Sequence, residues 1–498
     1  MIDNVENLTK LPKRWVWTTL KDVCLQPQYG WTTSAVQQGR LRLLRTTDIT
    51  SGKINWECVP FCEKEPDDKS KYLLEDGDIV ISRAGSVGFS LLIRNPKESI
   101  FASYLIRFKP LIDEDYAAYF LKTPVYWGVI SEKKLGIALA NVNATKLKEI
   151  AIPVAPLNEQ KRIVAKIEEL FTRLDAGVEA LKKVKAELKR YRQVVLKYAF
   201  EGKLTAEWRE KNKDRIEPAS KLLERIAKER EKTTKGKTKK LPMLDTSELP
   251  ELPDGWEWAR LGQICKEVTK VNPKDNPEHK FVYLDIESIE NRVNKITNPK
   301  QYSGKDAPSR ARQLVKANDI LFSTVRTYLR NIAMVDKKFD GQIASTGFCV
   351  IRPHEVIDRC LIFFLTLSDS FINPLSKIQR GTSYPAVRDS DVFEQVVPVI
   401  PIQEQRQIVS EIERHFSIAD EIEQTIEKSL KEAERLRQSI LKRAFEGKLV
   451  EQNPEDVPAE ELLKRIKAEK AKLQTEQKAK KKLKKSREKI KGGRNRKV

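Results

Sequence analysis

A long segment that occurs twice constrains this chain more than any other feature of its sequence. The first copy, residues 158–204, begins NEQKRIVAKIEELFTRLD and closes with LKYAFEGKL. The second copy, residues 403–449, begins QEQRQIVSEIERHFSIAD and closes with LKRAFEGKL, displaced by 245 residues throughout. Two copies in one constant register indicate an internal duplication rather than ordinary helix packing.

Apolar residues recur in each copy at alternating steps of three and four, the heptad period of a coiled coil. The predicted seam in the first copy is Ile167, Leu170, Leu174, Leu181, Val184, Leu188, Tyr191 and Val195. In the second copy it is Ile412, Ala419, Ile422, Ile426, Ala433, Leu436 and Ile440. Each copy predicts a helix of roughly 45 residues, about 65 Å long. Because so long a helix is not stable alone, we expect the copies to pair with each other.

The regions between the copies are duplicated as well. LPKRWVWTTLKDVC at 11–24 returns as LPDGWEWARLGQIC at 252–265, and DGDIVIS at 76–82 returns as ANDILFS at 317–323. Short β-prone runs bounded by Gly, Asp and Pro predict strands, with short helices among them. We therefore expect an α+β fold, in which two related α/β modules are separated by a long antiparallel two-helix coiled coil. The expected parts are module 1 (1–157), the first long helix (158–204), a short helix and basic linker (205–250), module 2 (251–402), the second long helix (403–449), and a short helix with a basic tail (450–498).

The charge of the chain suggests a polyanionic partner, because the net charge is +22. Residues 464–497 alone hold 17 basic and three acidic residues. Whether this tail is ordered or binds DNA stays open. The N-terminus has no apolar leader and no run approaches a membrane span, so we expect a cytoplasmic protein. The six scattered cysteines predict free thiols, and three histidines exclude a histidine-rich metal centre.

Motifs for catalysis are missing. The sequence has no GxxxxGK[ST] phosphate loop, and at 373–375 Asn-Pro is followed by Leu instead of the Pro-aromatic pair of amino-methylating DNA enzymes. Asp78 and Asp319 stand at matching strand starts, where a role in a turn is the simpler interpretation. The Glu-Gln pairs at 159–160 and 404–405 stand at helix starts and fit first-turn electrostatics. We therefore predict neither an active site nor a metal or cofactor site in this chain.

Two related modules on paired helices suit the reading of two short DNA half-sites separated by uncontacted base pairs. Loop residues that contact phosphates and base edges are mostly basic, amide, hydroxyl and aromatic ones. In module 1 the predicted DNA-contacting residues are Arg45, Thr46, Thr47, Ser82, Arg83, Ser103, Tyr104, Asn141 and Asn143. In module 2 they are Ser323, Thr324, Arg326, Tyr328, Arg330, Ser345, Arg380, Thr382, Ser383 and Tyr384. For any single position, a surface or strand-capping role is the alternative.

Several motifs together resemble those of one family. They are IPVAPLNEQKRIVAKIEEL at 152–170, VPVIPIQEQRQIVSEIE at 397–413, the two AFEGKL endings and the LPxxWxW openings. The chain resembles the specificity subunit of type I restriction–modification systems. The family pattern IPLPPLxEQ is altered only mildly here, since Ala155 and Ile400 replace its second proline.

This resemblance implies that the modules are target recognition domains that read a bipartite, asymmetric site in double-stranded DNA. It implies that the long helices set the spacing and dock two modification subunits, which bind S-adenosylmethionine and methylate adenine. Two restriction subunits then use ATP and Mg²⁺ for translocation and cleavage, so this chain is not itself catalytic. The alternatives are a coiled-coil scaffold or adaptor with duplicated protein-binding modules, and a self-contained methyltransferase or nuclease.

Overall fold

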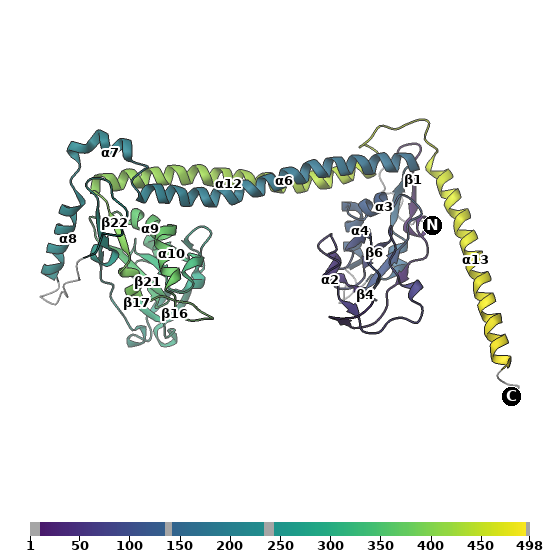
Figure 1. The fold of residues 1–498 in the computed structure, drawn as a ribbon, viewed down its shortest axis with the longest axis horizontal. Coiled ribbons are helices and arrows are strands. Elements are labelled where there is room, and N and C mark those ends of the chain that lie inside the picture. The colour runs from purple at the N-terminus through teal and green to yellow at the C-terminus, as the bar shows by residue number, and fades with distance from the viewer. Residues whose placement is uncertain (1–9, 135–141, 234–243, 495–498) are drawn as a thin grey trace. The chain divides into compact units, whose positions relative to one another are not determined.

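The computed structural model describes residues 10–134, 142–233 and 244–494. It divides into two compact units, which we call unit 1 (Met1–Leu181 and Lys428–Val498) and unit 2 (Lys182–Glu427). The two long helices, α6 (Leu157–Phe200) and α12 (Ile402–Phe445), have 44 residues each and contribute to both units (Figure 1). The prediction of a mixed helix and sheet fold with long helices and two domains is therefore confirmed.

Unit 1 contains two four-stranded sheets and one two-stranded sheet. The first has the order β2 (Gln28–Tyr29), β9 (Leu105–Phe108), β6 (Ile79–Ser82) and β7 (Ser90–Leu92), all antiparallel. The second has the order β3 (Ala35–Val36), β5 (Phe61–Cys62), β4 (Arg42–Leu44) and β8 (Ser99–Phe101), of which β4 and β8 are parallel. The third pairs β1 (Val16–Thr19) with β10 (Ala151–Val154). The helices are α1 (Leu20–Val23), α2 (Thr46–Ile49), η2 (Lys69–Lys71), α3 (Glu114–Phe120), α4 (Pro124–Lys134), α5 (Ala144–Lys148) and α13 (Ala459–Arg494).

Unit 2 repeats this plan with local changes. The first sheet has the order β12 (Cys265–Lys266), β21 (Phe348–Pro353), β18 (Ile320–Ser323) and β19 (Ile332–Met334). The second has the order β16 (Lys300–Ser303), β13 (Lys280–Leu284), β20 (Ile343–Ser345) and β17 (Ala311–Leu314), of which β13 and β20 are parallel. Two pairs complete it, β11 (Glu257–Arg260) with β22 (Val396–Val399) and β14 (Ile289–Glu290) with β15 (Lys295–Ile296).

The helices of unit 2 are α7 (Ala206–Asn212), η3 (Lys213–Arg215), α8 (Ala219–Thr233), η4 (Leu261–Ile264), η5 (Pro273–Asp275), η6 (Ile286–Ser288), η7 (Gly304–Asp306), η8 (Thr327–Leu329), η9 (Lys337–Phe339), α9 (Arg359–Leu367), α10 (Asp369–Lys377) and α11 (Asp389–Phe393).

The motifs DGDIVIS and ANDILFS form β6 and β18, each with a neighbour on both sides. All four residues of each strand are buried, as expected for an uninterrupted apolar run at the centre of a sheet.

The AFEGKL motifs end the two long helices. Gly202 and Gly447 follow the last helical turn with left-handed φ angles of 70° and 68°. The next N–H, of Lys203 or Lys448, reaches back to the carbonyl of Tyr198 (2.8 Å) or Arg443 (2.9 Å), the geometry of a Schellman cap. A Cβ at either glycine would collide with the proline of an LPxxW opening, Pro253 for Gly202 and Pro12 for Gly447. Each opening therefore packs against the helix end of its own unit.

A buried glutamine fastens the start of each long helix to the module beside it. In unit 1, Gln160 accepts a hydrogen bond from the N–H of Asp113 (3.0 Å) and donates one to the carbonyl of Ala155 (2.7 Å). In unit 2, Gln405 makes the same two bonds, with the N–H of Asp358 (2.7 Å) and the carbonyl of Ile400 (2.8 Å). These glutamines are at most 1% exposed, so they join two segments instead of serving only first-turn electrostatics.

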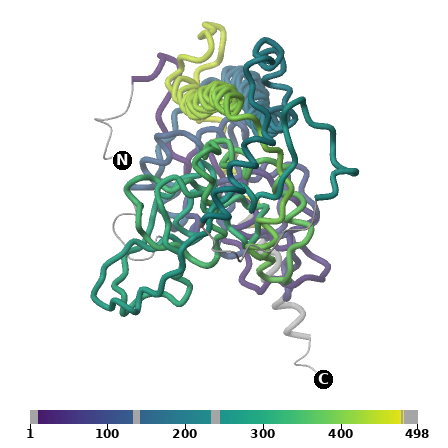
Figure 2. Tube along the Cα trace, turned by 90° about the vertical axis from the view of Figure 1, so that its left-hand side faces the viewer, coloured from purple at the N-terminus to yellow at the C-terminus, as the bar shows by residue number. Residues whose placement is uncertain are grey.

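The long helices lie side by side within each unit (Figures 1 and 2). In unit 2, Lys185 pairs with Glu427 (2.6 Å), whereas Arg192, farther along α6, pairs with Asp420 (2.6 Å), earlier in α12. The two helices therefore run antiparallel there. In unit 1, Arg437 of α12 pairs with Asp175 of α6, again in antiparallel register.

The predicted seam is only partly buried in the structure. Seven of its residues are buried, namely Ile167, Leu188, Val195, Ile412, Ala419, Ile426 and Ile440. Leu170, Leu174, Leu181 and Ala433 are half-buried. Val184, Tyr191, Ile422 and Leu436 are 38–52% exposed and do not lie in a closed seam. Polar pairs take part of the contact instead, including a hydrogen bond of 2.6 Å between Tyr191 and His415.

Replacing Gln405 by Ala removes both of its bonds and leaves the N–H of Asp358 without an acceptor. We expect the free energy of unfolding of unit 2 to fall by about 2 kcal/mol in urea denaturation of the full chain. Gln403 is exposed in the same helical turn, so the control Gln403→Ala should change it by less than about 0.5 kcal/mol. Equal losses in the two variants would contradict the role assigned to Gln405.

Candidate nucleic-acid interface

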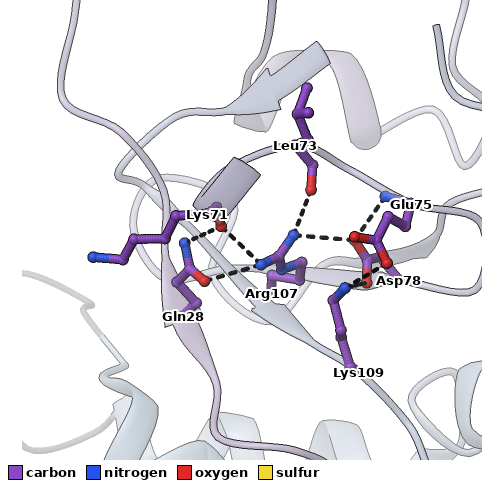
Figure 3. Close-up of polar contacts among 7 residues, drawn as sticks. All are labelled: Gln28, Lys71, Leu73, Glu75, Asp78, Arg107 and Lys109. Atoms are coloured by element: carbon purple, nitrogen blue, oxygen red, sulfur yellow. Dashed lines mark hydrogen bonds and ion pairs between the residues drawn. The ribbon is translucent and has the colours of Figure 1, made fainter. Parts of the chain in front are cut away.

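A buried ion pair supports the central strand of unit 1. Arg107 on β9 lies 3.4 Å from Asp78, which directly precedes β6, and their side chains are 8% and 2% exposed. Figure 3 shows the guanidinium of Arg107 enclosed by Asp78, the carbonyls of Lys71 and Leu73, and Gln28, whose oxygen accepts a hydrogen bond of 2.9 Å. Asp78 also accepts the N–H of Glu75 (2.9 Å), which closes the turn before β6.

Unit 2 contains the same ion pair at matching positions. Arg352 on β21 binds Asp319 before β18 at 2.6 and 2.8 Å, and it donates to the carbonyl of Leu314 (3.2 Å). Asp319 accepts the N–H of Lys316 at 2.7 Å. The predicted turn role of the two aspartates agrees with this geometry. We call each Asp–Arg pair, with the turn that it closes, a strand clamp.

Burial affects the pKa of two enclosed carboxylates of unit 1 more than their partners do. It raises the pKa of Asp78, while the N–H of Glu75 and the charge of Arg107 oppose the shift. Burial also raises the pKa of Glu159 at the start of α6, where Gln452 acts in the opposite direction. Both groups are enclosed by protein, so these shifts reflect structural burial rather than a reactive site.

The strand clamps hold β6 and β18 at their starts, and the predicted contact residues gather where these strands end. In unit 2, Thr324 follows β18, with its N–H and hydroxyl both 3.0 Å from the carbonyl of Gly347. Arg326 next donates its N–H to the carbonyl of Pro385 (2.7 Å) and a guanidinium N–H to that of Ser383 (3.1 Å). The loops after β18 and before α11 therefore meet, and they bring Arg326, Tyr328, Arg330, Arg380, Thr382, Ser383 and Tyr384 into one region.

Unit 1 brings fewer of the predicted residues together. Arg83 follows β6, donates its N–H to the carbonyl of Tyr104 (2.9 Å) and lies over the ring of Tyr29. Asn143 caps α5 by accepting the N–H of Lys146 (2.9 Å). Arg45, Thr46 and Thr47 lie at the start of α2, after β4 of the second sheet. Asn141 lies outside the described residues.

Four of the predicted contact residues are buried and do not reach the surface in this structure. They are Ser82, Ser323, Thr324 and Ser345, each at most 6% exposed. Their hydroxyls stabilise turns instead. Ser82 and Ser323 each donate to a carbonyl two residues later at 2.9 Å, and Ser345 accepts the N–H of Gly347 at 3.1 Å. In this structure these residues shape the loops from inside.

Several predicted arginines have acidic partners inside their own unit. Arg45 pairs with Asp48 (2.8 Å), Arg380 with Asp391 (2.6 Å) and Arg330 with Asp369. The hydrogen bond from Arg380 lowers the pKa of Asp391. Tyr104, Tyr328 and Tyr384 are 61%, 54% and 73% exposed, and the side chain of Arg380 is 54% exposed. Three of the predicted arginines are therefore paired with carboxylates, which residue type alone does not show.

Neither the two clamp arginines nor Leu329, which is 40% exposed beside Tyr328, was predicted from the sequence. An arginine inside an apolar strand, as in YLIRFKP and CVIRPHE, was the available signal for Arg107 and Arg352.

Within residues 10–134, 142–233 and 244–494, no group of His, Cys, Asp or Glu side chains is arranged to hold a metal ion. In the same ranges no helix combines the length and the apolar character of a membrane span.

A family model described as the type I restriction modification DNA specificity domain matches residues 12–190 and 253–432. The chain belongs to this family. It is thus a specificity subunit, as the resemblance predicted, and the catalytic steps belong to other subunits. The matched ranges cover both modules and most of both long helices.

Two curated relatives illustrate the likeness. The chain is 26% identical over 492 residues to the type I restriction enzyme EcoKI specificity subunit of Escherichia coli strain K12, covering 93% of this chain and 97% of that one. It is 28% identical over 351 residues to the EcoDI specificity subunit of Escherichia coli, covering 69% and 74%. A chain from a structural study of complex assembly and conformational transition of the type I R-M system shares the fold, with a TM-score of 0.62 and 18% identity over 89% of this chain and 100% of that one.

Replacing Arg107 by Ala leaves Asp78 buried without its cation. We expect the free energy of unfolding of unit 1 to fall by about 3–5 kcal/mol in urea denaturation. The control is Arg94→Ala, because Arg94 pairs with three acidic residues but its side chain is 38% exposed. That variant should lose about 1 kcal/mol or less. A clamp variant as stable as the control would show that the buried pair does not support the unit.

Proposed function

We propose that each unit reads one half of a bipartite, asymmetric site in double-stranded DNA. The observation that carries this proposal is a contrast within the two units. The contacts that support their central strands and helix starts are duplicated, whereas their loops differ. The strand clamps, the buried serines and the glutamine anchors recur at matching positions. The loops that follow β6 and β18 differ in length and in sequence. One support with two different contact surfaces suits two different half-sites.

We further propose that α6 and α12 pair as a coiled coil along their length and so set the gap between the half-sites. Two modification subunits and two restriction subunits would assemble on this chain and bind S-adenosylmethionine, ATP and Mg²⁺. The relatives named as type I restriction enzyme specificity subunits support a role within such a complex. The antiparallel ion pairs within each unit support the helix pairing.

The direct test is to map methylated adenines in DNA exposed to the complex assembled from this chain and its partner subunits. We expect two short, dissimilar sequences separated by a gap of constant length. Duplex selection with the same complex should enrich the same two sequences. Selection that enriches no motif would favour an adaptor whose modules bind proteins. Methyl transfer by the purified chain alone would contradict the delegation of catalysis.

The spacing role predicts the effect of lengthening both helices together. One heptad is inserted in α6 between Leu181 and Lys182 and another in α12 between Glu427 and Lys428, so that the antiparallel register is kept. We expect the gap between half-sites to grow by about three base pairs, since seven helical residues add roughly 10 Å and a base pair spans about 3.4 Å. Methylation mapping should return unchanged half-sites.

The control for this insertion places the same heptad in residues 244–250, which precede β11 and lie outside both long helices. That variant should keep the original gap. A gap unaffected by the paired insertion, or altered bases within either half-site, would contradict the spacing role of the helices.

A further inference from the structure

The loop between β18 and β19 exposes two large apolar side chains in succession. Tyr328 is 54% exposed and Leu329 is 40% exposed, both within the short helical turn η8. Single exposed hydrophobic residues are ordinary on protein surfaces. Two adjacent exposed apolar residues in one loop, in a protein of the DNA specificity family, indicate a contact surface.

The backbone of this loop is strained on both sides of the turn. Arg326 and Arg330 flank η8 with left-handed φ angles of 49° and 52°, which are unfavourable for residues with a side chain. The corresponding loop of unit 1, between β6 and β7, has glycine at its two left-handed positions, Gly85 and Gly88, with φ of 75° and 88°. Unit 2 thus keeps at a free-energy cost a conformation that unit 1 reaches with glycine, which points to a functional role.

The loop is also held firmly from inside its unit. Arg330 pairs with Asp369, and Thr327 lies 3.0 Å from the hydroxyl of Ser376. Asn291 donates to the carbonyl of Leu329 at 3.0 Å. Arg326, Thr327 and Arg330 therefore have partners within the unit, and Tyr328 and Leu329 are the large side chains that the loop exposes. This surface suits the faces of nucleic-acid bases better than phosphates, which would need free cations.

The corresponding loop in unit 1 packs inward. Val87 is 1% exposed. Phe89 is 39% exposed, but its ring packs edge-on against Trp127 with ring centroids 5.3 Å apart. A Cβ at Gly88 would lie 2.8 Å from Ile130, so the loop is pressed against α4. The loop of unit 1 thus exposes one large apolar side chain, which packs against Trp127, whereas the loop of unit 2 exposes two in succession.

We propose that Tyr328 and Leu329 form a wedge that inserts between two base pairs of the half-site read by unit 2. Apolar side chains inserted at a base step unstack it and kink the duplex, and flexible pyrimidine–purine steps yield most readily. The wedge selects such a base step because the step deforms readily, without hydrogen bonds to base edges. Tyr384, 73% exposed and stacked on the guanidinium of Arg326, provides a second aromatic face beside it. This inference rests on the proposed function.

The test compares the assembled complex carrying wild-type chain with complexes carrying Tyr328→Ala/Leu329→Ala or Tyr328→Phe, first in selection from a random duplex library. We expect the double variant to recover the unit 1 half-site unchanged and to lose the preference at one step of the other half-site. Its affinity for the wild-type duplex should be about ten-fold weaker. Tyr328→Phe should behave as wild type, since it keeps the ring. Val457→Ala, which removes an exposed apolar side chain outside both long helices and outside the predicted contact residues, is the matched control.

A mismatch at the selected step gives a second readout, because it reduces the free energy needed to unstack the bases. It should tighten binding by the wild-type complex and leave the double variant unaffected. A wild-type selection without any motif would overturn the proposed function itself. If the wild type selects a motif and the double variant selects the same motif with equal affinity, the wedge is wrong. Loss of binding in Tyr328→Phe would assign the role to its hydroxyl and also overturn the wedge.

Discussion

A buried arginine–aspartate pair at the start of the central strand is the interaction on which each unit depends. Asp78 with Arg107, and Asp319 with Arg352, close the turn before the strand and tie it to its neighbour in the sheet. A buried pair of this kind stabilises little by itself, but removing one partner leaves an unpaired charge in the interior. The position of the strand is therefore strictly fixed, and the loop at its far end projects from a rigid support.

The recurring motifs mark joints between segments rather than a reactive centre. Gln160 and Gln405 fasten helix starts to the turn before a short helix, and Gly202 and Gly447 end the helices beneath the LPxxW openings. Such joints permit almost no variation, because each has a buried polar group or a close backbone approach. The exposed residues of the loops have no such constraint, which explains why the duplication is evident in the joints and has diverged at the candidate interface.

Much of the fold followed from the sequence because periodicity and end signals are local. The heptads predicted the long helices, although the predicted segments 158–204 and 403–449 run past the helix ends at Phe200 and Phe445. The closure of the seam was harder to predict, since the structure places ion pairs such as Lys185–Glu427 between the helices and leaves Val184 exposed. At the candidate interface, residue type did not separate the buried turn hydroxyl of Ser323 from the exposed ring of Tyr328. That distinction depends on contacts with segments distant in sequence.

The central claim, that one support presents two independent contact surfaces, is tested most directly by exchanging residues 252–402 for the corresponding module of a relative. Methylated adenines are then mapped with the assembled complex. The account predicts that one half-site is replaced by a new sequence, while the other half-site and the gap remain as in the wild type. Changes in both half-sites, or in neither, would contradict it.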